Sequence, residues 1–244
     1  MAYAEFLPHP ALTAYIDAYW IAENQSSATQ TSRILPDGCV DLIFNLQNDC
    51  KSASGTILMK SETIYLIGTM TTFKESIQAP ETKLLGVRFK PAAFSSFYSF
   101  SSLHEFTDQN IEFEKAFAPD LYQVKKHADV YLNQFFLDKL TIHKHQIFPV
   151  INDINLSNGQ LKVKDLCEKH FITCRQLERQ FRYHVGLSPK EFINLVRYQF
   201  THNRIKNNIA NKALAEIAFE CGYYDHSHLT NALKKYTGLV PSEL

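Results

Sequence analysis

Residues 163–189, VKDLCEKHFITCRQLERQFRYHVGLSP, and residues 214–241, LAEIAFECGYYDHSHLTNALKKYTGLVP, repeat one pattern within a single chain. In both copies, apolar residues at helical spacing are followed by a short turn, a second apolar stripe and a closing Gly-Leu-x-Pro. The first stripes align at an offset of 51 residues and the second at 52, a difference that the turn absorbs. Two helices joined by a short turn form a helix-turn-helix unit, so the sequence predicts two such units.

Capping residues set where these helices begin. TCRQ at 173–176 and SPKE at 188–191 are capping boxes, in which the first and last side chains bond each other's backbone amides. Asp225 caps the second helix of the second copy. The box at 188–191 opens a helix that continues to about Asn207, roughly 27 Å at about 1.5 Å per residue. Successive major grooves of DNA lie about 34 Å apart, so this helix has the length to hold two recognition helices in adjacent grooves.

The side chains outside the apolar stripes are the candidates for DNA contact. Arginine reads guanine edges, glutamate accepts from cytosine, asparagine reads adenine, and lysine neutralises phosphate. In the first copy the candidates are Arg175, Glu178, Arg179 and Arg182, and in the second they are His226, Ser227, Thr230, Asn231 and Lys234. The first helix is therefore expected to supply more affinity than the second.

The charge distribution favours DNA over an ordinary solvated surface. Residues 151–244 contain 13 lysines and arginines against 9 aspartates and glutamates, whereas residues 1–150 contain 12 against 16. One amphipathic helix with arginines outside is more often only a solvated face. Two copies joined by a capped helix, in the basic part of the chain, indicate a polyanionic partner.

These two copies resemble the DNA-binding segment of the AraC/XylS family of bacterial transcription factors, over about residues 145–244. The resemblance implies that the second helix of each unit enters the major groove of double-stranded DNA and that the protein regulates transcription. It also implies RNA polymerase, a small-molecule effector and a second copy of the chain as further partners, and no cofactor. Asn231 stands where the family usually has arginine, and Leu233 where it usually has phenylalanine.

The first half of the chain has the pattern of a β domain. Turn residues separate short segments of strand-like composition, at 33–35, 39–45, 57–59, 64–68, 73–78 and 84–89. Many short strands at this spacing predict a small barrel or sandwich, and a fainter resemblance to the cupin-like regulatory domains of the same family points the same way. We expect an α+β protein with a β-rich regulatory domain at 1–120, a helical connector at 121–143 and the DNA-binding domain at 144–244.

Asp41 and Arg88 are charged residues within otherwise apolar strands. Such charges are either paired or line a cavity. One interpretation is that they pair with each other or with backbone groups. The other is a pocket for a small-molecule effector, formed by Tyr19, Trp20, Arg33, Asp41, Phe44 and Arg88.

Other classes of protein find less support in the sequence. The 244 residues are 45% hydrophobic and 20% charged, as in soluble globular proteins, and no apolar run reaches the about 18 residues of a membrane span. Five cysteines, an odd count without a CxxC motif, predict neither a disulfide framework nor a zinc ribbon, and they make reduced thiols in a cytoplasm the default expectation. The pairs His143-x-His145 and His226-x-His228 do not converge on one ion, so no metal site is expected.

Two alternatives remain. The chain is either a DNA-binding regulator or a small-molecule-binding or enzymatic barrel with a helical appendage, and the sequence contains no Gly-rich phosphate loop or nucleophile elbow to favour an enzyme. Cys39, beside a turn, is either a reactive thiol or an ordinary buried cysteine. Two assays distinguish the regulator from the barrel: a gel shift whose strength depends on salt indicates DNA binding, and turnover of small molecules indicates an enzyme.

Overall fold

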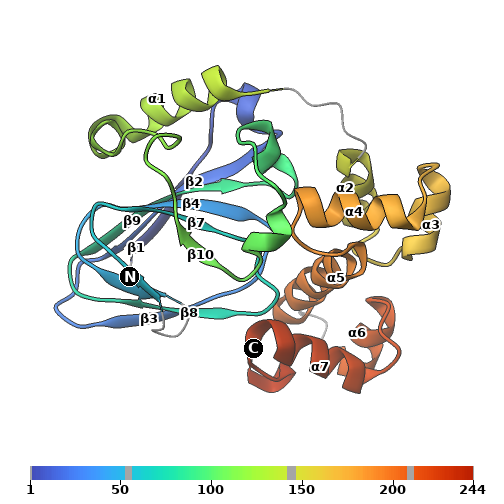
Figure 1. Cartoon of the computed structure of the whole chain (residues 1–244). Helices are drawn as coiled ribbons and strands as arrows, with labels where there is room; N and C mark the ends of the chain where they lie inside the picture. The colour runs from blue at the N-terminus through green and yellow to red at the C-terminus, as the bar shows by residue number, and fades with distance from the viewer. Residues whose placement is uncertain (1, 53–56, 142–146, 208–211, 244) are drawn as a thin grey trace.

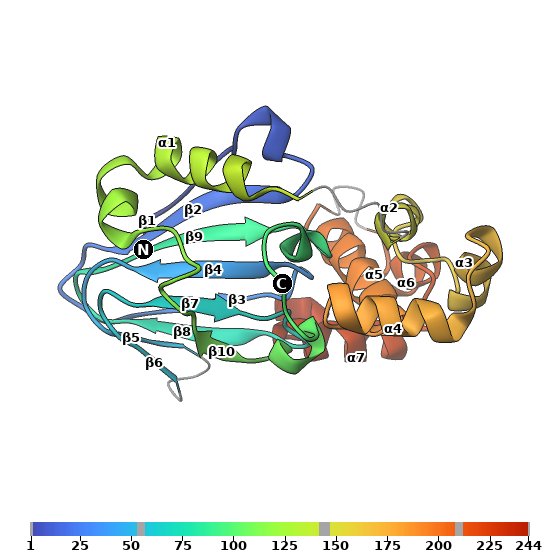
Figure 2. The ribbon, with the colours of Figure 1, turned by 45° about the horizontal axis from the view of Figure 1, so that its top comes forward.

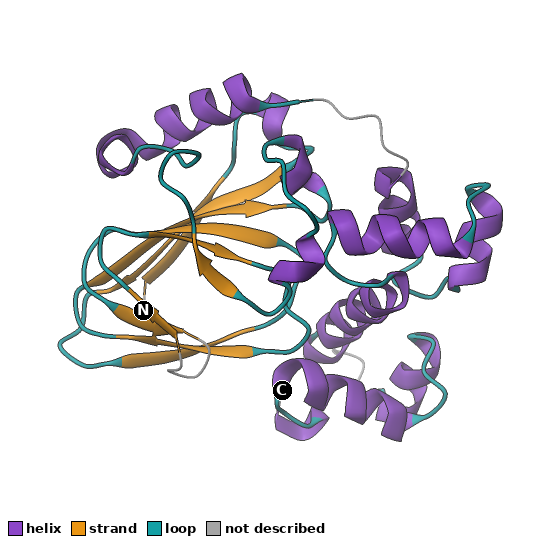
Figure 3. Cartoon of the chain, in the orientation of Figure 1, coloured by secondary structure: helices purple, strands orange, loops and turns teal. Residues whose placement is uncertain are grey.

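The computed structural model describes residues 2–52, 57–141, 147–207 and 212–243, which form a β domain followed by a helical domain (Figure 1). Among the described residues, all strands precede the α-helices along the chain, and the first long helix lies against the β domain (Figure 3). This is the α+β organisation that the sequence predicts.

Two antiparallel sheets face each other in the β domain (Figure 2). The larger has six strands in the order β1 (Ala2–Phe6), β2 (Ile16–Asn24), β9 (Thr82–Phe89), β4 (Val40–Asn45), β7 (Ile64–Ile67) and β10 (Asn110–Glu112). The smaller has four in the order β3 (Gln30–Ile34), β8 (Lys74–Gln78), β5 (Cys50–Ser52) and β6 (Ile57–Met59). Short 3-10 helices η1 (Pro10–Leu12), η2 (Ala93–Ser96) and η3 (Leu103–Phe106) lie in the connections.

Helix α1 (Leu121–Lys139) covers the outer face of the six-stranded sheet (Figure 2). Its Leu132 and Phe136 are fully buried in the same core as Leu42 and Phe44 of β4. The expectation of a separate connector at 121–143 is therefore wrong for the helix itself, because its apolar side is part of the β-domain core. Residues 142–146 of the expected connector and domain boundary lie outside the described residues.

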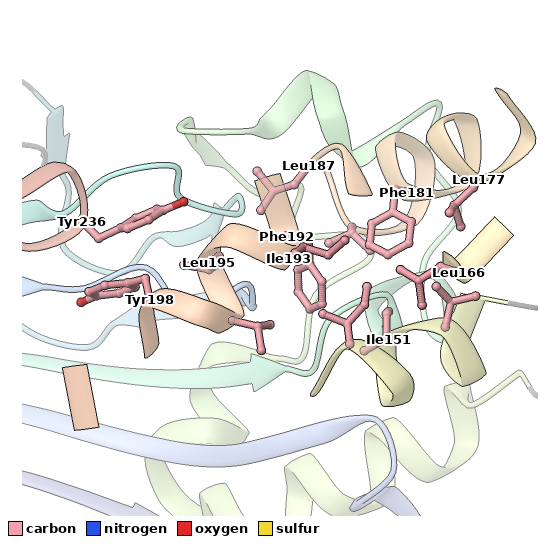
Figure 4. Packing of buried hydrophobic residues seen from close by; sticks show 14 of the residues in the cluster. Ile151, Leu166, Leu177, Phe181, Leu187, Phe192, Ile193, Leu195, Tyr198 and Tyr236 are labelled. Carbon is pink, nitrogen blue, oxygen red and sulfur yellow. The ribbon is translucent and has the colours of Figure 1, made fainter. Parts of the chain in front are cut away.

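The helical domain has one apolar core that both repeat units share (Figure 4). Its elements are α2 (Ile147–Leu156), α3 (Val163–Lys169), α4 (Cys174–His184), α5 (Pro189–Lys206), α6 (Leu214–Glu220), α7 (His226–Thr237) and η4 (Pro241–Glu243). Helices α3 and α4 form the first helix-turn-helix unit and α6 and α7 the second. In Figure 1, α5 runs between α4 and α7 and joins the two units.

The local signals that set these helices are confirmed. Thr173 Oγ1 accepts from the Gln176 amide at 3.2 Å, and the Ser188 box has the same geometry. Asp225 accepts from the His228 amide at 2.7 Å and caps α7. Gly238 ends α7 in the left-handed conformation, with φ +72°, which a residue without Cβ adopts at little cost.

Candidate DNA-binding surface and ligand cavity

Helix α4 has an apolar side in the core and a charged side outside. Leu177 and Phe181 are fully buried, and this orientation leaves Arg175 and Arg179 exposed one turn apart. Neither arginine forms a salt bridge with another residue in the described part of the chain. Both guanidinium groups are therefore available to a ligand outside the protein.

Glu178 and Arg182 differ from these two arginines. Arg182 Nε donates to Glu178 Oε1 at 2.9 Å, and Arg182 Nη1 lies 2.8 Å from Nε2 of His104 in the β domain. Of the four α4 residues predicted to contact DNA, Glu178 and Arg182 form an ion pair with each other. Arg175 and Arg179 form no salt bridge with any described residue.

Helix α7 presents a less charged side to solvent. His226, Ser227, Asn231 and Lys234 are exposed, while Thr230 is half-buried and its hydroxyl donates to the His226 carbonyl at 2.8 Å. Hydrogen bonding within the helix engages that hydroxyl, so Thr230 is a weaker candidate for DNA contact than the sequence indicates. Leu229 and Leu233 are fully buried and fix this orientation.

Helix α5 spaces the two units. It has 18 residues, about 27 Å at about 1.5 Å per residue. Its Phe192 lies against Phe181 of α4, with ring centroids 5.7 Å apart, and its Tyr198 stacks on Tyr236 of α7 at 4.5 Å. Aromatic contacts in the first turn and in the middle of α5 thus hold α4 and α7 on one helix.

A cavity of about 320 Å³ lies between the two sheets of the β domain. Its walls include Trp20, Arg33, Asp41 and Arg88 from the predicted pocket, together with apolar side chains such as Ile43 and Met59. Tyr19 and Phe44 are not among the lining residues: both are fully buried in the core under α1. Side chains alternate along a strand, and Tyr19 and Phe44 lie an odd number of positions from Trp20 and Asp41, so they point to the other face of the sheet. The pocket prediction was wrong for Tyr19 and Phe44.

The polar end of this cavity contains more carboxylates than cations. Asp41 Oδ1 accepts from Trp20 Nε1 at 2.7 Å and lies 3.7 Å from Arg88 Nε. Arg88 also lies 3.4 Å from Asp37 and 2.9 Å from Glu5. The two interpretations of Asp41 and Arg88 are thus compatible, because the pair is formed and also lines the cavity.

Residues 166–244 match the family model described as a helix-turn-helix domain, and residues 4–112 match a domain of unknown function (DUF6597). A segment of 79 residues is 25% identical to the HTH-type transcriptional activator RhaS of Escherichia fergusonii, and 24% identical to RhaS of Salmonella arizonae. Each match covers 32% of this chain and 28% of the relative, so the match spans under a third of the length of these proteins.

The C-terminal helices form an AraC-type helix-turn-helix domain. The fold of the whole chain is similar to that of ToxT from Vibrio cholerae, with a TM-score of 0.53 and 14% identity over 92% of this chain and 97% of that chain. A second structure of ToxT, in its apo form, has a TM-score of 0.51 and 12% identity over 93% and 95%.

Side chains of the β domain form hydrogen bonds with the AraC-type domain at the turn that follows α4. Thr69 Oγ1 donates to the Val185 carbonyl at 2.6 Å. The Gly186 carbonyl accepts from Thr107 Oγ1 at 2.8 Å and from His104 Nδ1 at 2.9 Å. Sequence reasoning missed these residues, because isolated threonines and a histidine in loops carry no periodic signal.

Arg33 joins the cavity to the other end of the AraC-type domain. It lines the cavity, and its Nη1 donates to the Thr237 carbonyl at the end of α7, at 2.7 Å. Its guanidinium lies 4.8 Å from the centre of the Phe73 ring, which also packs against Gly238, where an added Cβ would come within 2.6 Å of the ring. One side chain therefore touches both the cavity and α7.

Burial and mutual repulsion raise the pKa values of two acidic groups of the cavity, Asp37 and Asp41. Burial, reinforced by the Asp37 carboxylate and opposed by Arg88, raises the pKa of Asp41 to about 7. Burial also raises the pKa of Asp37. Burial would lower the pKa of Arg88, but Asp41 and Asp37 outweigh it and raise that pKa, so the guanidinium stays charged.

Gln78 lines the cavity, whereas Cys39 is not among its lining residues. Gln78 is 3% exposed, and its Oε1 accepts no hydrogen bond from the described residues, so this wall of the cavity carries an open acceptor. Burial, with Asp37 and Asp41 adding to it, raises the pKa of the Cys39 thiol well above its usual value. A reactive cysteine acts as the thiolate, so this shift favours the interpretation of Cys39 as an ordinary cysteine.

Metal and membrane signals are weak in the part of the chain that the structure describes. No group of three or more His, Cys, Asp or Glu side chains there has the geometry to hold an ion. His143 and His145 lie outside the described residues. None of the described helices is long and apolar enough to cross a bilayer.

Proposed function

We propose that this chain is a sequence-specific transcriptional regulator of the AraC type, in which α4 and α7 bind adjacent major grooves of double-stranded DNA. The observation that carries the proposal is the pair of helix-turn-helix units packed on one helix, α5, each with polar or charged side chains exposed on its second helix. Binding rather than chemistry is the mechanism, so no catalytic residue is proposed. Selection of genomic fragments with the purified protein, followed by gel shifts at several salt concentrations, tests it.

The two helices are proposed to contribute differently. Arg175 and Arg179 supply charge and bidentate base contacts from α4. His226, Ser227 and Asn231 of α7 supply phosphate bonds and an adenine contact, with less electrostatic attraction. Failure to retain any genomic fragment above a random-sequence background would refute the regulator and favour the small-molecule-binding barrel.

Lys234→Ala is expected to weaken binding to all DNA sequences alike and to lower the slope of log affinity against log salt by about one. The reason is that an exposed lysine near the end of α7 neutralises one phosphate without reading a base. Gel shifts on a selected and a scrambled duplex, each at four salt concentrations, give both numbers. Lys60→Ala, an exposed lysine of the β domain, is the matched control and should leave the slope unchanged.

A small-molecule effector is proposed to occupy the cavity of the β domain, against Trp20, Asp41 and Arg88. The open Gln78 acceptor and the link from Arg33 to α7 support this, because binding there has a direct route to the AraC-type domain. A second copy of the chain and RNA polymerase are proposed as further partners, and the cytoplasm as the compartment. Sedimentation of the protein with and without DNA tests the dimer.

Arg88→Ala is expected to lower the free energy of unfolding by about 2–4 kcal/mol at pH 8, and by clearly less at pH 5. At pH 8 the Asp41 and Asp37 carboxylates lose their counter-charge, whereas at pH 5 a pKa already raised to about 7 leaves Asp41 neutral. Urea unfolding at the two pH values measures the difference. Lys83→Ala, which removes a half-buried surface pair with Glu23, should cost under about 1 kcal/mol at both pH values.

A further inference from the structure

Two cysteines of the first helix-turn-helix unit lie in contact. Cys167 is in α3 and Cys174 is the first residue of α4, and their Sγ atoms are 2.6 Å apart. Both are free thiols in this structure. A disulfide bond needs an Sγ–Sγ distance of about 2.05 Å, so the two sulfurs need to approach by only about half an ångström.

The backbone of the turn sets this approach. The Ile172 amide donates to the Cys167 carbonyl at 3.1 Å, and Phe171 takes the left-handed conformation with φ +51°. Thr173, the residue before Cys174, then caps the N-terminus of α4. Because hydrogen bonds on both sides fix the turn, the cysteines meet as part of the fold and not through a flexible loop.

The two thiols have different surroundings. Cys174 is exposed, whereas Cys167 is 7% exposed and packs in the core of the helical domain. Burial raises the pKa of the Cys167 thiol to about 11. A solute in water therefore reaches the Cys174 sulfur first, and the Cys167 sulfur is in contact with it on the buried side.

We propose that Cys167 and Cys174 form a peroxide-sensitive dithiol, which closes to a disulfide that ties α4 to α3. The Cys174 sulfur attacks one oxygen of hydrogen peroxide, the O–O bond breaks, a sulfenic acid forms and one water leaves. The Cys167 sulfur then attacks the Cys174 sulfur, the S–O bond breaks, the S–S bond forms and a second water leaves. Two thiols and one peroxide thus give one disulfide and two waters.

The second helix-turn-helix unit lacks this pair. The positions that correspond to Cys167 and Cys174 are Ala218 and His226. Oxidation therefore acts on α4, the more strongly charged of the two reading helices, and leaves α7 unchanged. The chemistry needs no DNA, so the proposal stands or fails independently of the proposed regulatory function.

Peptide mapping of the full-length protein tests the bond directly. Trypsin cleaves after Lys164, Lys169 and Arg175, which places Cys167 in peptide 165–169 and Cys174 in peptide 170–175. After stoichiometric hydrogen peroxide and alkylation, the two peptides are expected to appear as one linked species, and dithiothreitol should release them. The number of alkylated cysteines should fall from five to three.

Variants separate this pair from the other cysteines. Cys167→Ser and Cys174→Ser should each abolish the linked species, and Cys39→Ser should retain it. Peroxide should also raise the thermal midpoint of the wild-type helical domain by about 5 °C, as a disulfide over a short loop does, and should leave the midpoint of Cys167→Ser unchanged. A wild-type protein that accumulates sulfinic acid at Cys174, or that links a different pair, overturns the proposal.

Discussion

Replacing both exposed arginines of α4, Arg175→Ala with Arg179→Ala, is expected to weaken binding to a selected DNA site by about 100-fold or more. A bidentate arginine contact to a base is worth about 1–3 kcal/mol, and every 1.4 kcal/mol is about tenfold in affinity. Both side chains are exposed one turn apart on α4, one of the two helices proposed to enter the major groove. Fluorescence anisotropy with a labelled duplex from the genomic selection, at one fixed salt concentration, measures the loss.

Arg182→Ala is the matched control on the same helix. Arg182 bonds Glu178 and contacts His104, so its removal is expected to reduce affinity by less than about tenfold. The double variant should also lose its preference for the selected site over a scrambled duplex. Equal losses on both duplexes, or an Arg182 effect as large as that of the pair, would show that α4 does not read bases.

Phe181→Ala is expected to lower the free energy of unfolding by about 3–5 kcal/mol, because it leaves a cavity where the ring was fully buried. The ring lies between α4 and α5, against Phe192, so the cavity opens where the first unit joins the connecting helix (Figure 4). Urea unfolding followed by circular dichroism measures the change. Phe171→Ala, in the same unit but 97% exposed, should stay within about 0.5 kcal/mol, and an equal loss in the two variants would contradict this packing.

The helical domain was predictable from sequence because its signals are local. The capping residues Thr173, Ser188 and Asp225 each act on the amide three residues ahead, and Gly238 needs only its own left-handed conformation. The repeated apolar stripes then gave both units and the side of each helix that faces the core. A short-range signal of this kind does not depend on what the rest of the chain does.

The β domain depended more on distant partners. The strand Ala2–Phe6 is almost wholly exposed, so its sequence carries no alternation of buried and exposed residues. It is a strand because it pairs with Ile16–Asn24. Alternation did place Asp41 on one face of its strand, yet Phe44 was assigned to the same pocket although it faces the other side. The contact of Arg182 with His104 joins residues 78 positions apart, and no pattern within either segment encodes it.

If the cavity binds the proposed effector, this effector and helix α7 would compete for the guanidinium group of Arg33. Its hydrogen bond to the Thr237 carbonyl is made from the wall of the cavity, so an effector that draws this side chain inward removes a bond from the end of α7. Thermodynamic reciprocity then requires the converse: a DNA site that holds α7 away from Arg33 increases the affinity of the cavity for that effector by the same factor. Operator DNA and effector would thus each report on the presence of the other.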